Sequence, residues 1–385
     1  MNSSSKADCH LCNSRNSVLL NNKFPELARI TSDCRQWKNN GHLGECNQCG
    51  SVVKPITRAW QTEVKNIYDD YQIYHQGAGE EPTVFVGGFE EQFKRSEALF
   101  GMCIPFFPNR KNGKLLDIGS GNGAVLRAMG PFLEDWKMFG YDITDRYQTS
   151  VESIHGVAGF FVGELNQISL SFDIITLAHV LEHVPNPLAF LSTVLTLLNE
   201  GGLLIIQVPD SETNFFDLVV ADHCSHFTTF TLCELVKKTG MEVVAAETGW
   251  MPRQLLLLAY KRVHSKAIEH PKKISELKSI SADGVDWLIK VRDHAKYHRS
   301  KSRTFGIFGS ANNAVWLASE LDGQVSFFVD EDHSRIGQKL LGKPIISPDQ
   351  VIDGSSVYIA MPIVVAEKIM HRLFSKRGFY ILPPA

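Results

Sequence analysis

The sequence predicts an α/β protein with a Rossmann-like sheet at its centre, a cysteine-bearing module before it and a small second α/β unit after it. From residue 114 onward, short apolar runs alternate with segments long enough to form helices. This pattern is typical of parallel strands joined by crossover helices. The alternation starts again near residue 304, and two pairs of closely spaced cysteines lie within the first 50 residues.

Composition indicates a globular chain of two or three domains. The 385 residues exceed one typical core, and 44% hydrophobic with 21% charged residues are ordinary proportions. The net charge of −3 indicates neither a nucleic-acid nor an anionic-membrane partner, and no apolar run is long enough to cross a bilayer. Because the first residues lack the apolar core of a signal peptide, we expect a cytoplasmic protein whose cysteines bind metal or stay reduced.

The N-terminal cysteines form two Cys-x2-Cys hooks, Cys9 with Cys12 and Cys46 with Cys49. Four thiolates complete a tetrahedral Zn²⁺ site and leave no coordination position for chemistry, so the spacing predicts structural zinc, with free thiols as the alternative. Residues 1–58 contain eight Lys and Arg against four Asp and Glu, too small an excess for an RNA-binding surface. We expect this module to shape a substrate cleft.

The segment 59–110 is expected to be mainly helical, with one helix over residues 88–103. The strands of the central unit are expected in the runs KLLDIG, KMFGYD, GFFVG, FDIITLA and GGLLIIQVP, and a further strand, LLLLAY, closes the sheet.

A glycine-rich segment, DIGSGNG over 117–123, joins the first predicted strand to a helix. Gly119 and Gly121 permit a tight turn and the close approach of a ligand, and the N–H groups at the helix start favour an anionic group. The second strand ends at Asp142, which could bind both ribose hydroxyls of a nucleoside or cap a helix. The third strand ends near Glu164, which could meet an adenine base or solvent.

The pattern D-x-G-x-G-x-G differs from the G-x-G-x-x-G of dinucleotide enzymes and resembles the first motif of class I methyltransferases. The resemblance extends from about residue 113 to 209 and includes FDIITLAHVLEHVPNP (172–187) and LNEGG (198–202). It implies S-adenosylmethionine as the cofactor, with Glu182 and His183 packing behind the site. The expected cofactor-binding residues are Asp117, Gly119, Ser120, Gly121, Asp142, Glu164 and His179.

The run from His179 to His183 also matches the H-x-x-E-H pattern of zinc proteases. That pattern needs two histidines on one helical face. Because the run follows a buried strand, and Pro185 and Pro187 would shorten a helix, we reject the protease interpretation.

The segment PDSETNFFDLVVADHCSHFTTFT (209–231) is expected to reach over the carboxyl ends of the strands. It contains Asp222, His223 and His226. A histidine titrates near neutrality and suits proton abstraction, and Asp222 could orient His223. Each histidine could instead be a surface or capping residue.

The order of cysteine hooks, methyltransferase domain and small α/β unit resembles the three-domain sugar C-methyltransferases, which act on nucleotide-linked keto-deoxysugars. In that family an E-H-x-S-Y-F run carries the catalytic histidine, and residues 222–227 here are D-H-C-S-H-F. His226 stands where the family has tyrosine, which removes a hydroxyl at that position. The family also places an N-terminal tyrosine near the sugar. Tyr71 and Tyr74 are our candidates, with core packing as the alternative.

The C-terminal unit starts with RTFGIFGS (303–310), and a strand ending in an acid follows about 20 residues later. Only Gly306 and Gly309 of the dinucleotide glycine pattern remain, so we expect no NAD site. The resemblance implies that Gly309, Ser310 and Asn312 help to hold the nucleotide-sugar, and a structural cap is the alternative.

The sequence therefore predicts S-adenosylmethionine-dependent methylation of a nucleotide-linked sugar, with C-methylation of a 4-keto-deoxysugar through an enolate and His223 as general base. O-methylation, an RNA or protein substrate recognised by the zinc module, and a non-catalytic scaffold are the alternatives. We expect no nucleic-acid or membrane partner, and the oligomeric state stays open. The predicted divisions are a zinc-binding module (1–58), a helical substrate-facing segment (59–110), the methyltransferase domain (111–262), a helical linker (263–303) and a Rossmann-like C-terminal α/β domain (304–385).

Overall fold

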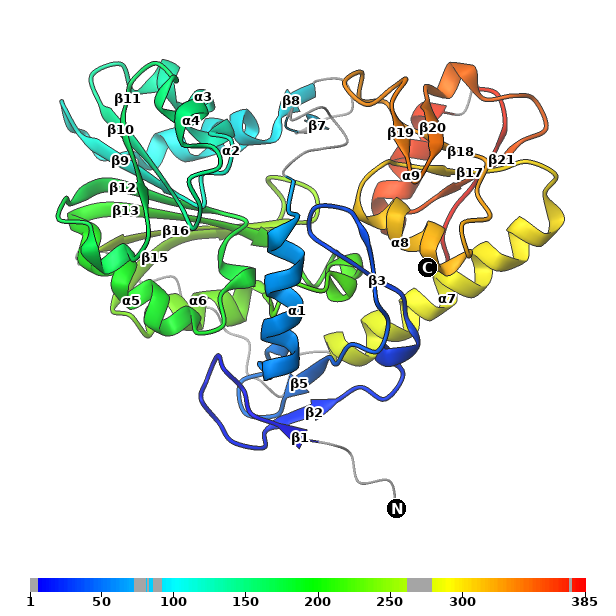
Figure 1. Ribbon diagram of the computed structural model, residues 1–385, viewed down its shortest axis with the longest axis horizontal. Coiled ribbons are helices and arrows are strands. Elements are labelled where there is room, and N and C mark those ends of the chain that lie inside the picture. Colours follow the sequence, from blue (N-terminus) through cyan, green and yellow to red (C-terminus); the bar gives the residue numbers. More distant parts are fainter. Residues whose placement is uncertain (1–5, 73–80, 82, 86–91, 262–278, 374–375) are drawn as a thin grey trace.

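The computed structural model describes residues 6–72, 81, 83–85, 92–261, 279–373 and 376–385 (Figure 1). Three larger sheets, of seven, six and five strands, organise the chain. In Figure 1 the seven-stranded sheet lies on the left, the six-stranded sheet on the right and the five-stranded sheet at the bottom. Within the described ranges, no helix combines the length and the apolar character needed to cross a membrane.

The central sheet has the strand order β11-β10-β9-β12-β13-β16-β15, in which only β16 runs antiparallel to its neighbours. The chain starts in the middle of the sheet and reverses its winding between β9 and β12, so the predicted mostly parallel α/β sheet is confirmed. The strands are β9 (Lys114–Ile118), β10 (Lys137–Asp142), β11 (Val157–Val162), β12 (Phe172–Ala178), β13 (Leu198–Pro209), β15 (Met241–Glu247) and β16 (Gln254–Lys261).

Helices cover both faces of this sheet, because neighbouring residues of a strand point to opposite sides. Leu115 and Leu116 of β9 are both fully buried, but they belong to the cores on opposite faces. Burial on both faces accounts for the continuous apolar runs in the sequence. The helices are α2 (Arg95–Cys103), α3 (Ala124–Met129) and α4 (Gln148–Glu152) on one face, and α5 (Pro187–Leu197) and α6 (Thr229–Lys237) on the other.

The segment before the central sheet contains a β-hairpin as well as helices. Strands β7 (Thr83–Phe85) and β8 (Gln92–Lys94) pair antiparallel, so the helix predicted over 88–103 is wrong over residues 92–94, and its residues 88–91 lie outside the described residues. The helix α2 begins only at residue 95, because the Lys94 amide donates a hydrogen bond to the Glu97 side chain and caps the helix there.

The five-stranded sheet of the N-terminal module takes its last strand from the central domain. Ser225 pairs with Val53 and His226 with Val52, both antiparallel. The module therefore holds in place the segment that follows the fifth central strand. Its elements are β1 (Lys6–Ala7), β2 (Val18–Leu20), β5 (Gly44–Cys46), β6 (Val52–Val53) and β14 (Ser225–His226), the hairpin of β3 (Arg29–Ile30) and β4 (Gln36–Trp37), and the helix α1 (Arg58–Asp69).

The C-terminal sheet has the order β19-β20-β18-β17-β21-β22, parallel from β20 to β22. Its winding reverses between β17 and β21, where α8 begins. The elements are β17 (Phe305–Phe308), α8 (Asn312–Glu320), β18 (Phe327–Val329), β19 (Lys339–Leu340), β20 (Lys343–Ile346), β21 (Ser356–Ile359), α9 (Ile363–Leu373) and β22 (Phe379–Ile381).

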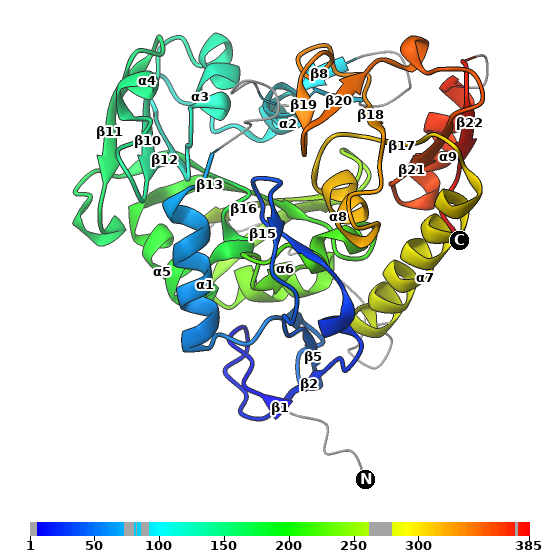
Figure 2. The same cartoon turned by 45° about the vertical axis from the view of Figure 1, so that its right-hand side comes forward.

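One apolar core joins the N-terminal module to the C-terminal sheet. It includes Phe24 of the module, Phe216 of the short 3-10 helix η7 (Phe215–Val219) and Trp316 of α8, each almost fully buried. The long helix α7 (Ile280–Lys301) packs in the same core and extends from the module to the C-terminal sheet, as Figure 2 shows. The segment after β13 is therefore packed between both outer parts of the chain.

Candidate functional site

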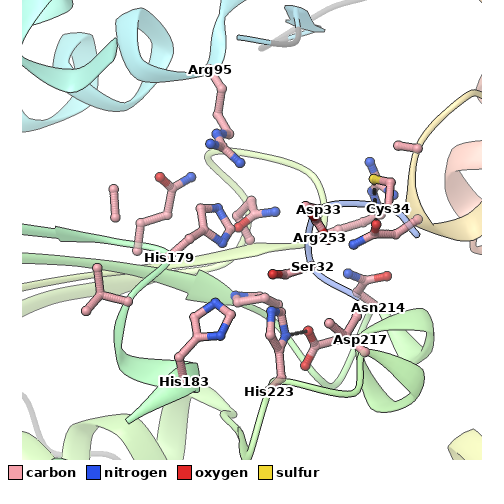
Figure 3. A pocket seen from close by; sticks show the side chains of 18 of the residues that line it. Ser32, Asp33, Cys34, Arg95, His179, His183, Asn214, Asp217, His223 and Arg253 are labelled. Atoms are coloured by element: carbon pink, nitrogen blue, oxygen red, sulfur yellow. Dashed lines mark hydrogen bonds and ion pairs between the residues drawn. The ribbon is translucent and has the colours of Figure 1, made fainter. Parts of the chain in front are cut away.

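A cavity of about 1970 Å³ opens at the carboxyl ends of the central strands. Its walls come from the glycine-rich loop after β9, residues 32–34 of the N-terminal module, the segment after β13 and the loops after β17 and β18. Figure 3 shows residues 32–34 and the histidines of the central domain around this cavity. Single-ligand sites are usually about 300–1,000 Å³. The cavity is therefore large enough for two ligands side by side.

The glycine-rich loop has a backbone that only glycine tolerates. Gly119 has φ of +74°, and a Cβ atom added there would lie 2.5 Å from Cγ2 of Val180. Next to it, the Ser120 hydroxyl is buried and forms no hydrogen bond with the described residues. The loop thus offers a close backbone approach and a free polar group, as binding of an amino-acid and nucleoside cofactor requires.

Of the three acids expected at the cofactor site, two line the cavity and the third lies beneath the glycine-rich loop. Asp142 lines the cavity and accepts hydrogen bonds from the amides of Gly121 (3.0 Å) and Ile143 (2.8 Å), and burial raises its pKa. Glu164 also lines the cavity and is exposed. Asp117 lies beneath the loop, where it accepts a hydrogen bond from the Thr176 hydroxyl at 2.6 Å and burial raises its pKa to about 7.

His179 follows β12 and turns its ring into the cavity. Its φ of +57° is unusual for a residue with a side chain and marks a tight exit from the strand. Nδ1 lies 3.0 Å from Oε1 of Glu182, and the buried Nε2 has no hydrogen-bond partner in the described part of the chain. The 3-10 helix η6 (Leu181–His183) has only three residues, so the H-x-x-E-H histidines do not share a helical face.

His223 lines the cavity and is paired with Asp217, not with Asp222. Its Nδ1 lies 2.6 Å from Oδ1 of Asp217, which leaves Nε2 as the nitrogen that can accept a proton. Burial lowers the pKa of His223, but the charge and hydrogen bond of Asp217, together with the charges of Glu182 and Asp222, outweigh this effect and the net pKa is raised. Asp217 was missed in the sequence, because it lies on η7, six residues before the histidine.

Asp222 points away from His223, which corrects the expected pairing. Its carboxylate accepts hydrogen bonds from the amide and hydroxyl of Ser32 at 2.9 and 2.5 Å, and its other close contact is Nδ1 of His183 at 3.4 Å. The chain turns at residues 221–222, where the His223 amide donates a hydrogen bond to the Val220 carbonyl at 3.3 Å, so the side chains of Asp222 and His223 leave the backbone in different directions. Asp222 therefore anchors the N-terminal loop that forms part of the cavity wall.

His226, also expected to be catalytic, lies behind the cavity wall. Its Nδ1 lies 2.5 Å from Oδ2 of Asp217 and its Nε2 lies 3.1 Å from Nζ of Lys54, so both ring nitrogens are occupied. Burial lowers its pKa to about 4. His226 can hold Asp217 in place, but a substrate in the cavity cannot reach it.

Lys54 connects the N-terminal module to this histidine segment. Its fully buried ammonium donates hydrogen bonds to the carbonyls of Val220 (2.6 Å) and His223 (2.8 Å). Burial lowers the pKa of Lys54 to about 7. No pattern in the sequence marks this lysine, because its partners are backbone atoms about 170 residues away.

His183 and Tyr68 complete the base of the cavity. The His183 ring stands edge-on to the His223 ring at 4.5 Å between centroids, so its expected place behind the site is wrong. Tyr68 places its hydroxyl 3.1 Å from Nδ1 of His183 and stacks on Tyr71, which also lines the cavity. The other candidate tyrosine, Tyr74, lies outside the described residues.

The predicted C-terminal residues Gly309, Ser310 and Asn312 all line the cavity at its far side. Gly309 has φ of +97°, and the Ser310 hydroxyl donates to Oδ2 of Asp330 at 2.5 Å. Asn312 begins α8 and accepts a hydrogen bond from the Cys34 thiol at 2.6 Å. This contact joins the C-terminal domain to the N-terminal loop.

The four hook cysteines converge outside the cavity. Their sulfur atoms all lie within 4.8 Å of one another, with Cys9 to Cys49 and Cys12 to Cys46 both at 3.7 Å. A tetrahedral zinc ion with thiolate bonds of about 2.3 Å separates its sulfurs by about 3.8 Å. The cluster therefore has the shape that such an ion requires.

A doubly wound sheet with a glycine loop after its first strand, an acid after its second and a large cavity at the switch point defines a class I methyltransferase domain. The free polar atoms of Ser120 and His179 around a cradle of glycines fit S-adenosylmethionine.

Residues 94–246 match the family model described as a methyltransferase domain. The chain therefore contains a methyltransferase domain, and the prediction of an S-adenosylmethionine-dependent methyltransferase is confirmed at the level of this domain. No curated protein matches the chain.

Similar solved structures include three methyltransferases. The CurJ carbon methyltransferase shares 17% identity over 43% of this chain, with a TM-score of 0.36, and only 52% of its own length is matched. A putative methyltransferase from Bacillus halodurans shares 19% identity over 38% of this chain and 70% of its own, with a TM-score of 0.32. The plantazolicin methyltransferase BpumL in complex with SAH shares 14% identity over 43% of this chain and 83% of its own, with a TM-score of 0.36.

Proposed function

We propose that the protein methylates a nucleotide-linked 4-keto-sugar at the carbon next to the ketone. The observation that carries this proposal is the pair of His223 and Asp217 in the cavity, 2.6 Å apart, with the second ring nitrogen of the histidine left for a substrate proton. The carbon next to a sugar ketone becomes nucleophilic when its proton is removed, so a placed base is what such chemistry needs from the protein. S-adenosylmethionine, when bound, supplies the electrophilic sulfonium methyl group.

The two cavity histidines differ in basicity, which selects His223 as the base. Asp217 raises the pKa of His223 against the effect of burial, whereas burial and then the charge of His223 lower the pKa of His183. Because a carboxylate can only accept, Asp217 also requires the proton of the neutral His223 ring to reside on Nδ1. Nε2 of His223 therefore takes the substrate proton, and the enolate left behind accepts the methyl group.

The other predicted site residues divide between a cofactor end and a substrate end of the cavity. We assign Gly119, Ser120, Gly121, Asp142, Glu164 and His179 to the cofactor, and Asp117 to support of the loop from below. The far wall, with Gly309, Ser310 and Asn312, would hold the nucleotide-sugar, since a cavity of 1970 Å³ has room for it beside the cofactor. Tyr71 and Tyr68 line the space between these ends.

We also propose that the four hook cysteines bind a structural Zn²⁺. The support is that the four sulfur atoms lie within 4.8 Å of one another, a spacing at which one tetrahedral ion would use all four thiols. Cys34 and His10, the other ligand types near the hooks, bond instead to Asn312 and Ser225. Metal analysis of the purified protein should find about one zinc per chain, and none in a Cys46→Ser Cys49→Ser variant.

The direct test uses labelled S-adenosylmethionine with matched nucleotide-linked sugars that do or do not carry a 4-keto group. We expect label only in the keto-sugars, attached to carbon by NMR. His223→Ala should lower kcat by about 10²- to 10⁴-fold and leave cofactor binding intact, as expected for loss of a general base. His155→Ala, an exposed histidine away from the cavity, is the matched control. Label on oxygen, or full activity of His223→Ala, would overturn the enolate mechanism.

A second candidate is O-methylation of a sugar hydroxyl. The ligand atoms of Glu182, His183 and His223 lie within 4.8 Å of one another, so a divalent cation could also fit there and polarise a hydroxyl. In that case added Mg²⁺ or Mn²⁺ should raise the rate and label should appear on oxygen. The enolate mechanism predicts no such requirement.

A further inference from the structure

The cavity is lined by a partly buried arginine, Arg253, that the proposed chemistry does not use. Arg253 lies directly before β16, and no described residue forms an ion pair or a hydrogen bond with its side chain. Its Nε atom is buried without a partner. An Nε–H group in this state has lost its water and gained no acceptor in exchange, which is unfavourable unless a ligand supplies one.

The backbone at Arg253 is also unusual. Its φ is +66°, a conformation that side-chain-bearing residues rarely adopt, and its carbonyl accepts a hydrogen bond from the Asp210 amide at 3.1 Å. Such strain is found mostly where function requires a particular side-chain direction. Here the direction is into the cavity, since Figure 3 shows Arg253 among the side chains that line it.

A second arginine approaches from the C-terminal domain. Arg335 lines the same cavity, and only 11% of its side chain is exposed. Its contacts to Asp330 and Asp332 are loose, at 3.6 and 3.8 Å, and its Nε atom is buried without a hydrogen bond in the described part of the chain. One direct bond, from Nη1 to the Ser310 hydroxyl at 3.1 Å, fixes the side chain beside the loop before α8.

The two arginines affect each other across the cavity. Burial lowers the pKa of Arg253, and the positive charge of Arg335 lowers it further. Like charges brought together in a buried site repel, and a dianion between them would remove that cost. The paired N–H groups of a guanidinium also match the oxygens of a phosphate.

The position of the pair excludes the cofactor as its partner. The glycine loop follows β9, whereas Arg253 precedes β16, and both β12 and β13 lie between these strands. Asp142 and Glu164, the acids assigned to the cofactor, are on the side of β10 and β11, farther away still. Arg253 and Arg335 therefore belong to the substrate end of the cavity.

We propose that Arg253 and Arg335 bind the diphosphate of the substrate, one guanidinium from the methyltransferase domain and one from the C-terminal domain. The inference rests on the proposed function, which supplies a nucleotide-linked substrate. It adds the consequence that the diphosphate couples the two domains, because its charge is satisfied only when both arginines face it. Ser310, which bonds to Arg335, becomes a positioning residue for this contact.

The test is calorimetric titration with uridine and thymidine diphosphates and with inorganic pyrophosphate, so no methyl transfer is needed. Arg253→Gln and Arg335→Gln should each weaken binding by about 10- to 100-fold, as loss of a charge-assisted hydrogen-bond pair does. Arg253→Lys should fall between the wild type and Arg253→Gln, because lysine keeps the charge and loses the fork. Arg377→Gln is the matched control, since 68% of its side chain is exposed and it does not line the cavity.

Binding of S-adenosylhomocysteine should be unchanged in all four variants, which also verifies that they are folded. If both glutamine variants bind the diphosphates as tightly as the wild type, the arginine assignment is overturned while the proposed function stands. If the wild type binds none of the three probes, the assignment also fails. The labelling experiment then decides separately whether a nucleotide-linked sugar is the substrate.

Discussion

The two ends of the cavity are built in different ways. The cofactor end is formed by neighbouring segments of one domain, the loop after β9 and the ends of β10, β11 and β12, within residues 117–179. The substrate end combines Ser32 of the N-terminal module, His223 of the central domain and Arg335 of the C-terminal domain. A cofactor common to many enzymes can be held by a local motif, whereas a particular substrate is held by surfaces that only packing brings together. Variants at the two ends should therefore have separable effects on cofactor binding and on the chemical step.

The largest effect within this comparison is expected from Asp217→Asn. The wild-type rate should rise with pH through the raised pKa of His223, above its usual 6.5, because only the neutral ring accepts a proton. Without the charge of Asp217 that pKa falls, so the acidic limb should move to lower pH while the plateau rate drops by about 10²-fold.

The measurement is kcat against pH for both proteins. Asp222→Asn is the control, since its carboxylate bonds to Ser32 and is only a minor influence on His223. A limb that moves more in Asp222→Asn than in Asp217→Asn would mean that the wrong acid has been paired with the base.

At the cofactor end of the cavity, Asp142→Ala is expected to have an intermediate effect on ligand binding. Loss of a carboxylate that accepts from two ribose hydroxyls should weaken S-adenosylmethionine binding by about 10- to 100-fold, with nucleoside diphosphate binding unchanged. Because Asp142 also bonds to the Gly121 amide, Asp142→Asn, which keeps an acceptor, should lose less. Equal weakening of both ligands would show that the two ends are not independent.

The smallest effect is expected from Lys54→Met, which removes the clamp between the module and the histidine segment. Two buried carbonyls lose their donor, at about 1–3 kcal/mol, so Tm should fall by a few degrees. kcat should fall severalfold with cofactor affinity unchanged, because only His223 is displaced. Lys65→Met, at a lysine of α1 that lines the cavity, serves as the control for loss of a positive charge in the cavity wall. A Lys54→Met variant with wild-type kcat would show that the clamp does not position the base.

Local patterns predicted the central sheet, the glycine loop and the acid at Asp142, since each depends on contacts within one strand-loop-helix unit. The four hook cysteines were also visible, because tetrahedral coordination leaves a spacing signature. The sequence-based predictions were wrong where they depended on the direction of a side chain or on the pairing of distant strands. Asp222 precedes His223 in sequence yet faces the other way, and the hairpin at β7 and β8 interrupts an apolar spacing that resembles a helix.

The sequence by itself determined that this chain has a mostly parallel sheet with a cofactor loop at its switch point, because alternation and glycine spacing are properties of neighbouring residues. Only the tertiary structure decided that Asp217 pairs with His223, that Lys54 holds the backbone at His223, and that Arg253 and Arg335 line the same cavity. These residues are separated by 6, about 170 and 82 positions from their partners, and no local spacing encodes which of many charged side chains will meet. The shared apolar core around Phe216 and Trp316 determines which of these side chains come together, because it fixes how the outer parts of the chain pack against the central domain.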